Sequence, residues 1–177
     1  MKKGKTIVDI LLFIVTISLF DIGLTGNLNH EILGTAIGIL FTIHIVLNFK
    51  WIKQVSQNLK SVNIKTKIMY IIDIFIMLVY LGSIICGVLI SNEIFNFKMS
   101  SNLFVVILHL ILGRLAIIIM LIHLGLHLYR ILAKIKNNKL KMVVYSIYIV
   151  LVLLITIYFL YTLTHSFQWM YVFGNME

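Results

Sequence analysis

Five long apolar stretches constrain what this chain can fold into more than any other feature. A helix needs about 20 mainly apolar residues to cross a bilayer core of roughly 30 Å. We expect five such spans, at Ile7–Leu24, Glu31–Phe49, Ile68–Ile90, Leu103–Tyr129 and Met142–Tyr161. Charged residues make up 12% of the chain, against about 25% in soluble domains. The sequence therefore predicts an all-α integral membrane protein.

The basic residues lie at alternate ends of the expected spans. All 15 lysines and arginines except Lys98 and Arg114 precede the first span, or lie between the second and third or the fourth and fifth. The positive-inside rule then predicts a multi-pass protein of the cytoplasmic membrane with a cytoplasmic N-terminus and an external C-terminus. This distribution indicates that the basic residues lie at the surface of a lipid membrane, and it argues against binding to nucleic acid.

An internal repeat relates the second span to the fourth. Both read His-x-Ile-Leu-Gly, then eight residues, then Ile-His, with histidines at His30 and His44 and again at His109 and His123. The first and third spans repeat more weakly, because Asp9-Ile and Gly23 match Asp73-Ile and Gly87 at the same spacing. The repeat unit is a helical hairpin. We therefore expect a four-helix transmembrane bundle of two tandem hairpins at residues 1–134, with a fifth transmembrane helix and an external tail at residues 135–177.

The spacing of the histidines predicts where they lie in this bundle. Fourteen residues make two heptads and rise roughly 21 Å, so both histidines of a span keep the same inward face. An axis along the membrane normal relates parallel repeats, and it sets His30 opposite His109 at an outer level and His44 opposite His123 at an inner level. Two facing imidazoles at each level suit a planar iron porphyrin held from both sides.

Glycines recur at the outer level, where missing side chains leave room for a flat macrocycle. Gly34 and Gly113 follow the outer histidines by one turn, and Gly23 and Gly87 are expected at the same level on the first and third spans. Alternatively, these small residues simply let membrane helices approach closely.

The paired histidines resemble those of the di-haem cytochrome b superfamily, which includes cytochrome b561-like proteins and the cytochrome b subunits of formate dehydrogenases and hydrogenases. The phrases HEILGTAIGILFTIHIVLNFKWI and LHLILGRLAIIIMLIHLGLH are most similar to an uncharacterised prokaryotic membrane family within it. The resemblance covers about residues 5–130. It implies two non-covalent b haems, with His30, His44, His109 and His123 as axial ligands, and electron transfer between a quinone pool and a redox partner protein.

Several other residues carry weaker expectations. His127 lies one turn beyond His123, and could replace it as a ligand, bond a haem propionate, exchange protons with a quinone, or simply face water. Arg114 pairs either with a propionate of the outer haem or with Asp21 or Glu31. His165 is expected in the outer interfacial belt, and Cys86, the single cysteine, as buried filler.

Asp9 and Asp73 occupy equivalent places near the inner starts of the first and third spans. A carboxylate at such a place favours the helix dipole. Alternatively, it accepts a hydrogen bond from an inner histidine and orients it.

These observations favour an electron-transfer protein, or the membrane subunit of an oxidoreductase, that conducts electrons across the membrane. Two other classes remain as alternatives. One is a haem-free transporter or channel whose histidines bind ions or protons, and the other is an assembly factor with inert histidines. A simple metal-ion site is less favoured, because no carboxylate shares the histidine repeat.

Overall fold

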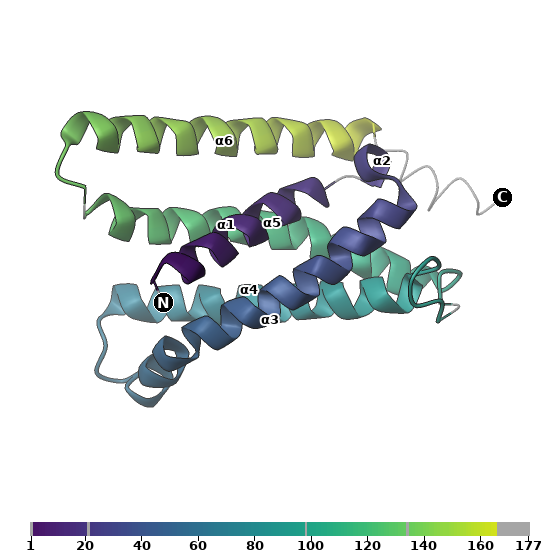
Figure 1. The fold of residues 1–177 in the computed structure, drawn as a ribbon, viewed down its shortest axis with the longest axis horizontal. Coiled ribbons are helices and arrows are strands. Elements are labelled where there is room, and N and C mark those ends of the chain that lie inside the picture. The colour runs from purple at the N-terminus through teal and green to yellow at the C-terminus, as the bar shows by residue number, and fades with distance from the viewer. Residues whose placement is uncertain (1, 21, 98, 134, 166–177) are drawn as a thin grey trace. The chain divides into compact units, whose positions relative to one another are not determined.

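The described part of the chain is entirely helical. The computed structural model describes residues 2–20, 22–97, 99–133 and 135–165, and its regular elements are all α-helices. In chain order they are α1 (Lys2–Ser18), α2 (Ile22–Thr25), α3 (Asn27–Gln57), α4 (Ile64–Ile90), α5 (Leu103–Leu132) and α6 (Asn138–His165) (Figure 1).

Four of these helices are long and apolar enough to cross a membrane. Within the described residues the spans are Asn27–Gln57, Ile64–Ile90, Leu103–Leu128 and Asn138–Tyr161. They carry many exposed large apolar side chains, including Val46, Phe104 and Leu154. Such surfaces are rare on soluble monomers and suit the hydrocarbon of a bilayer. The structure therefore supports a multi-pass helical membrane protein.

The first predicted span is divided in the structure. Its 17-residue helix, α1, would be about 25 Å long at 1.5 Å per residue, which is shorter than a typical bilayer core. The helix ends where the Ser18 hydroxyl donates to the Ile14 carbonyl at 3.0 Å and the Phe20 amide donates to the Ile17 carbonyl at 3.2 Å. Serine bonding back to the preceding turn competes with regular helix hydrogen bonds, and the three-residue spacing of the second bond tightens the last turn.

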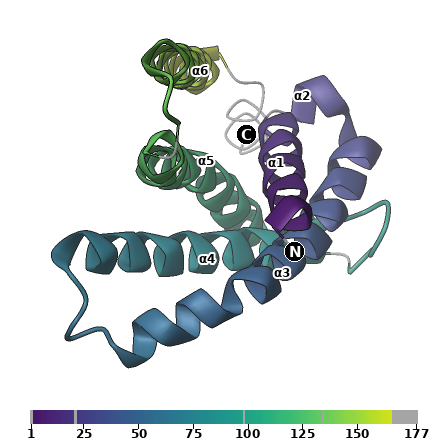
Figure 2. The ribbon, with the colours of Figure 1, turned by 60° about the vertical axis from the view of Figure 1, so that its left-hand side comes forward.

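Local chemistry explains the starts of α3 and α4. Gly26 precedes α3 with a φ of 74°, a left-handed conformation that glycine adopts without steric penalty. The Asn63 side chain accepts a hydrogen bond from the Thr66 amide at 2.9 Å and so caps the first turn of α4. The turn at residues 58–63 joins α3 to α4 (Figure 2).

The chain divides into two compact units, Met1–Met120 and Leu121–Glu177. The predicted division between residues 134 and 135 stays a prediction. In the first unit, α1 packs against α3 and α3 packs against α4. Its core contains aliphatic and aromatic side chains of three helices: Ile37 and Phe41 of α3, Val79 and Tyr80 of α4, and Ala116 and Ile119 of α5.

A buried polar contact joins α1 to this core. The Thr16 and Tyr80 hydroxyls lie 2.9 Å apart and are hydrogen-bonded, while the Tyr80 ring stacks on Phe41 with ring centroids 5.3 Å apart. Because an unpaired hydroxyl is costly in an apolar interior, this pair fixes the position of α1 against α4.

In the second unit, α6 packs against the end of α5 through Tyr148. The Tyr148 hydroxyl donates to the Leu121 carbonyl at 3.0 Å, and its ring lies where a side chain on Gly125 would be. A Cβ at position 125 would force the Tyr148 side chain to shift.

Candidate functional site

Two histidines predicted to face one another, His30 and His109, lie together in the first unit. His30 belongs to the first turn of α3 and His109 to the second turn of α5. Their ring centroids are 6.3 Å apart, and the ring planes are inclined at 82°. A metal ion bound at about 2.0–2.1 Å by a nitrogen of each of two imidazoles holds those nitrogens about 4 Å apart and the ring centres roughly 6 Å apart. The observed separation is that of an edge-to-face ring contact, and it is also compatible with one ion bound by the two rings on opposite sides.

A backbone carbonyl fixes the His109 ring. Its Nδ1 lies 2.9 Å from the Ser83 carbonyl oxygen of α4. A carbonyl only accepts hydrogen bonds, so Nδ1 carries the proton and Nε2 of the neutral ring keeps a lone pair. The histidine is thus oriented as metal-ligating histidines usually are, with one nitrogen held by an acceptor and the other left as the ligand.

Gly87 of α4 makes room for the same ring. A Cβ built on Gly87 would lie 3.0 Å from His109 Cε1 and 3.4 Å from Nδ1. The sequence predicted that Gly87 would leave space for a macrocycle, whereas in the structure the space beside it holds the His109 imidazole.

The other glycines predicted at this level have different surroundings. A Cβ on Gly34 would meet nothing within 4 Å, and Gly34 lines an apolar groove of about 420 Å³ between α3 and α4. A Cβ on Gly113 would lie 3.8 Å from the Ser83 hydroxyl oxygen, which is an ordinary contact between α4 and α5. Gly23 lies in the short helix α2.

Next to His30, the Glu31 carboxylate binds the loop that follows α4. It accepts hydrogen bonds from the Ser91 hydroxyl at 2.6 Å and from the backbone amides of Asn92, Glu93 and Ile94 at 2.9–3.0 Å. These bonds tie the start of α3 to the end of α4. The sequence offered Glu31 as one partner for Arg114, and it gave no sign that loop amides would bind this carboxylate. Arg114 itself is half-buried on α5.

The third predicted ligand, His44, is part of a polar cluster between α1 and α3. Its Nδ1 lies 2.7 Å from the Asp9 carboxylate. Asn48, one turn along α3, donates to the His44 carbonyl at 2.8 Å and lies 3.4 Å from Nε2. Lys5 of α1 donates in turn to the Asn48 side-chain carbonyl.

The structure corrects the interpretation of the two aspartates as helix-dipole partners. The helix dipole acts within the first turn, but α1 begins at Lys2 and α4 at Ile64, well before Asp9 and Asp73. For Asp9 the alternative interpretation, a bond to an inner histidine, is the one that the structure shows. Sequence reasoning missed Lys5 and Asn48, although each lies one turn from Asp9 or His44 on the same helix.

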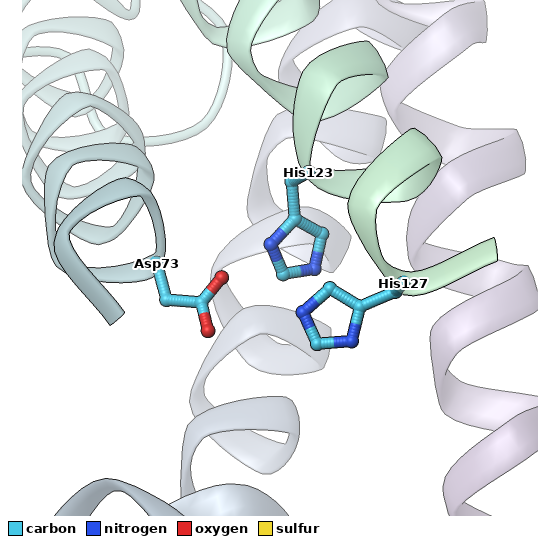
Figure 3. Close-up of side chains that lie close together, drawn as sticks. All are labelled: Asp73, His123 and His127. Atoms are coloured by element: carbon cyan, nitrogen blue, oxygen red, sulfur yellow. The ribbon is translucent and has the colours of Figure 1, made fainter. Parts of the chain in front are cut away.

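The remaining predicted histidines of α5 lie in the second unit. His123 and His127 project from successive turns, with ring centroids 4.3 Å apart and planes inclined at 34° (Figure 3). His165 is the last residue of α6, and its side chain lies outside the described residues, as does Asp21. Cys86 is buried, as predicted.

Comparisons with known proteins identify no relative. The chain matches no family model, no curated protein and no solved structure. The functional argument therefore depends on the geometry of the histidines and their partners.

Proposed function

We propose that this chain is a membrane cytochrome that holds two b-type haems and conducts electrons across the membrane. One observation supports this most strongly. His30 and His109, separated by 79 positions in the sequence, bring their rings to a centroid distance of 6.3 Å, which is compatible with one ion bound between two imidazoles. Haem iron, when bound, supplies one-electron chemistry by alternating between ferric and ferrous states.

The chain's own residues supply orientation and insulation. His30 and His109 would hold the outer haem, with the Ser83 carbonyl keeping Nε2 of His109 available. The repeat assigns His44 and His123 to the inner haem. The hydrocarbon of the bundle excludes water from both levels, and this low polarity contributes to the reduction potential.

The wider setting belongs to the same proposal. We infer five transmembrane helices, the four long ones and α1. The N-terminus would be cytoplasmic and the C-terminus external. Electrons would pass between a quinone pool and a redox partner protein. His127 and Arg114 are the candidates for contacts with the haem propionates.

Matched histidine variants test the ligand pairing. His30→Ala and His109→Ala should each remove the same haem, and His44→Ala and His123→Ala should each remove the other, because each pair shares one iron. Haem content and the midpoint of the haem that remains would be measured in detergent-purified protein. If the single variants His30→Ala and His44→Ala each lost the same haem and kept the second one, both ligands of that haem would lie on one helix. That result would overturn the pairing. Glu93→Gln, in the loop after α4, is a control that should keep both haems.

A further inference from the structure

We propose that the basic end of the hairpin formed by α3 and α4 binds the headgroups of anionic lipids. This basic end comprises the last turns of α3, the connecting turn and the first turn of α4 (Figure 2). It contains five lysines: Lys50, Lys53, Lys60, Lys65 and Lys67. No aspartate or glutamate occurs between positions 32 and 72, so this stretch supplies no carboxylate to the lysines. Lipid binding here does not depend on the proposed haems.

The lengths of the two helices place the basic end at the edge of the hydrocarbon. The 31 residues of α3 would extend about 46 Å and the 27 residues of α4 about 40 Å, whereas a bilayer core is about 30 Å thick. Residues 32–49 carry no charged side chain, and residues 68–90 carry one, Asp73. The hydrocarbon therefore ends near Phe49 on α3 and near Ile68 on α4, and the five lysines lie beyond these points, where the headgroups are.

Aromatic and buried apolar side chains support the same level and make the basic end a packed unit. The rings of Trp51 on α3 and Tyr70 on α4 lie with their centroids 6.3 Å apart. Tryptophan and tyrosine are enriched at the headgroup level of membrane proteins. Val55 of α3 and Met69 of α4 are both buried, so the two helices stay packed as they leave the hydrocarbon.

The turn between the helices is closed by its own hydrogen bonds. The Ser61 amide donates to the Asn58 carbonyl at 3.0 Å, and the Asn58 side chain donates to the Gln54 carbonyl at 2.9 Å. The Lys67 ammonium donates to the Lys60 carbonyl at 3.3 Å, which holds the turn against the first turn of α4. The backbone that carries the lysines is thus ordered before any lipid binds, and less entropy is lost on binding.

Exposed apolar side chains among the lysines favour a lipid over other anionic partners. Four of the lysines are exposed: Lys50, Lys53, Lys60 and Lys65. Four large apolar side chains are exposed among them: Phe49, Leu59, Ile64 and Ile68. A lipid surface accepts both kinds of group, because ammonium groups bind the phosphates while apolar side chains enter the boundary with the acyl chains. A nucleic acid or an acidic protein surface would match the lysines alone.

Trp51 provides a local probe of the lipid beside the basic end. In a Trp169→Phe background it is the single tryptophan of the full chain. The protein would be reconstituted in vesicles of phosphatidylcholine with increasing amounts of phosphatidylglycerol, and one of the two lipids would carry bromine on its acyl chains. Bromine quenches the fluorescence of a nearby indole. Quenching relative to the same mixture without bromine then gives the relative binding constant of the two lipids beside Trp51.

We expect phosphatidylglycerol to bind beside Trp51 more tightly than phosphatidylcholine. A lysine near an anionic surface contributes a factor of about five in binding, so the double variant Lys50→Gln, Lys53→Gln should lower the preference at least about fivefold. The matched double variant Lys50→Arg, Lys53→Arg keeps both charges and should keep the preference. Added salt should weaken the preference in the unsubstituted protein, because exposed charges are screened.

Two outcomes would overturn lipid binding at the basic end. Equal quenching by the two brominated lipids without lysine substitutions would show no selection of the anionic headgroup, and would leave the lysines to solvent or to an acidic protein. The same preference in the glutamine and arginine double variants would show that these ammonium groups are not its source. Haem content is measured separately in the same preparations, so a colourless protein that still selects phosphatidylglycerol would contradict the proposed function and support the lipid surface.

Discussion

Adding one methyl group at Gly87 should disturb the outer histidine pair. The new Cβ of Gly87→Ala would lie 3.0 Å from Cε1 of His109, so the imidazole must move by several tenths of an ångström. The His109 ring is hydrogen-bonded to the Ser83 carbonyl and contacts the His30 ring. A shift of the His109 ring would weaken both contacts. We expect tighter haem binding at the outer level in wild type than in Gly87→Ala.

The magnitude follows from three contributions. Overpacking a filled site destabilises by about 1–3 kcal/mol, and a weakened hydrogen bond adds about 0.5–1.5 kcal/mol. Replacing glycine by alanine within a helix contributes about 1 kcal/mol in the opposite direction. The net loss of stability should be about 0.5–3.5 kcal/mol. Disturbing a residue that orients a metal ligand typically lowers affinity about 10–100-fold, and we expect this loss for the outer haem.

Gly38→Ala is the matched control. Its Cβ would meet only Ile84 Cγ2 at 3.7 Å, an ordinary contact, so its stability should be equal to or slightly above that of wild type. Haem titration into haem-depleted protein and thermal unfolding in detergent measure the two effects. The reasoning is refuted if Gly87→Ala and Gly38→Ala bind the outer haem with equal affinity and unfold at the same temperature.

Three further predictions concern the surrounding structure. Tyr80→Phe should destabilise the first unit by about 0.5–1.5 kcal/mol. The double variant with Thr16→Val should be destabilised no more than the more affected single variant. Additive losses of stability in thermal unfolding would show that the two hydroxyls act separately. Glu31→Gln should lower stability by about 1–3 kcal/mol, because hydrogen bonds to a charged acceptor are stronger than those to a neutral one, and unchanged unfolding would contradict the importance of the loop contacts. In a Cys86→Ser background, a membrane-impermeant thiol reagent should label Ser101→Cys on intact cells. It should label Ser61→Cys only after the membrane is opened. The reverse pattern would show the opposite orientation to the one proposed.

The repeat predicted that His30 lies opposite His109, because a heptad spacing and a shared axis place them together without knowledge of the loops, and the two rings do lie together. It could not predict that the Ser83 carbonyl would hold His109, since every residue carries such an acceptor and no residue type marks it. The same holds for the loop amides that bind Glu31.

Helix ends were harder to predict than helix positions. Residues 7–24 are mostly apolar, with only two charged residues, Asp9 and Asp21, and therefore indicated one span. In the structure, the Ser18 side chain and a tightened last turn end α1 early. Asp9 and Asp73 were expected near the starts of their helices for a related reason. Both α1 and α4 begin in basic, polar sequence, which hydropathy assigns to the loops, so each helix starts earlier than predicted. Asp9 then lies beyond the first turn, where its carboxylate contacts His44 instead of the helix end.

Haem content of the purified full-length chain tests the central claim most directly. Protein from haem-replete cells should contain about two haem b per chain by absorbance of its pyridine complex, and acidified acetone should extract both, because the only cysteine lies in no Cys-x-x-Cys-His motif. A variant with alanine at His30, His44, His109 and His123 should contain none. Colourless wild-type protein, or haem retained by the four-histidine variant, would contradict the account.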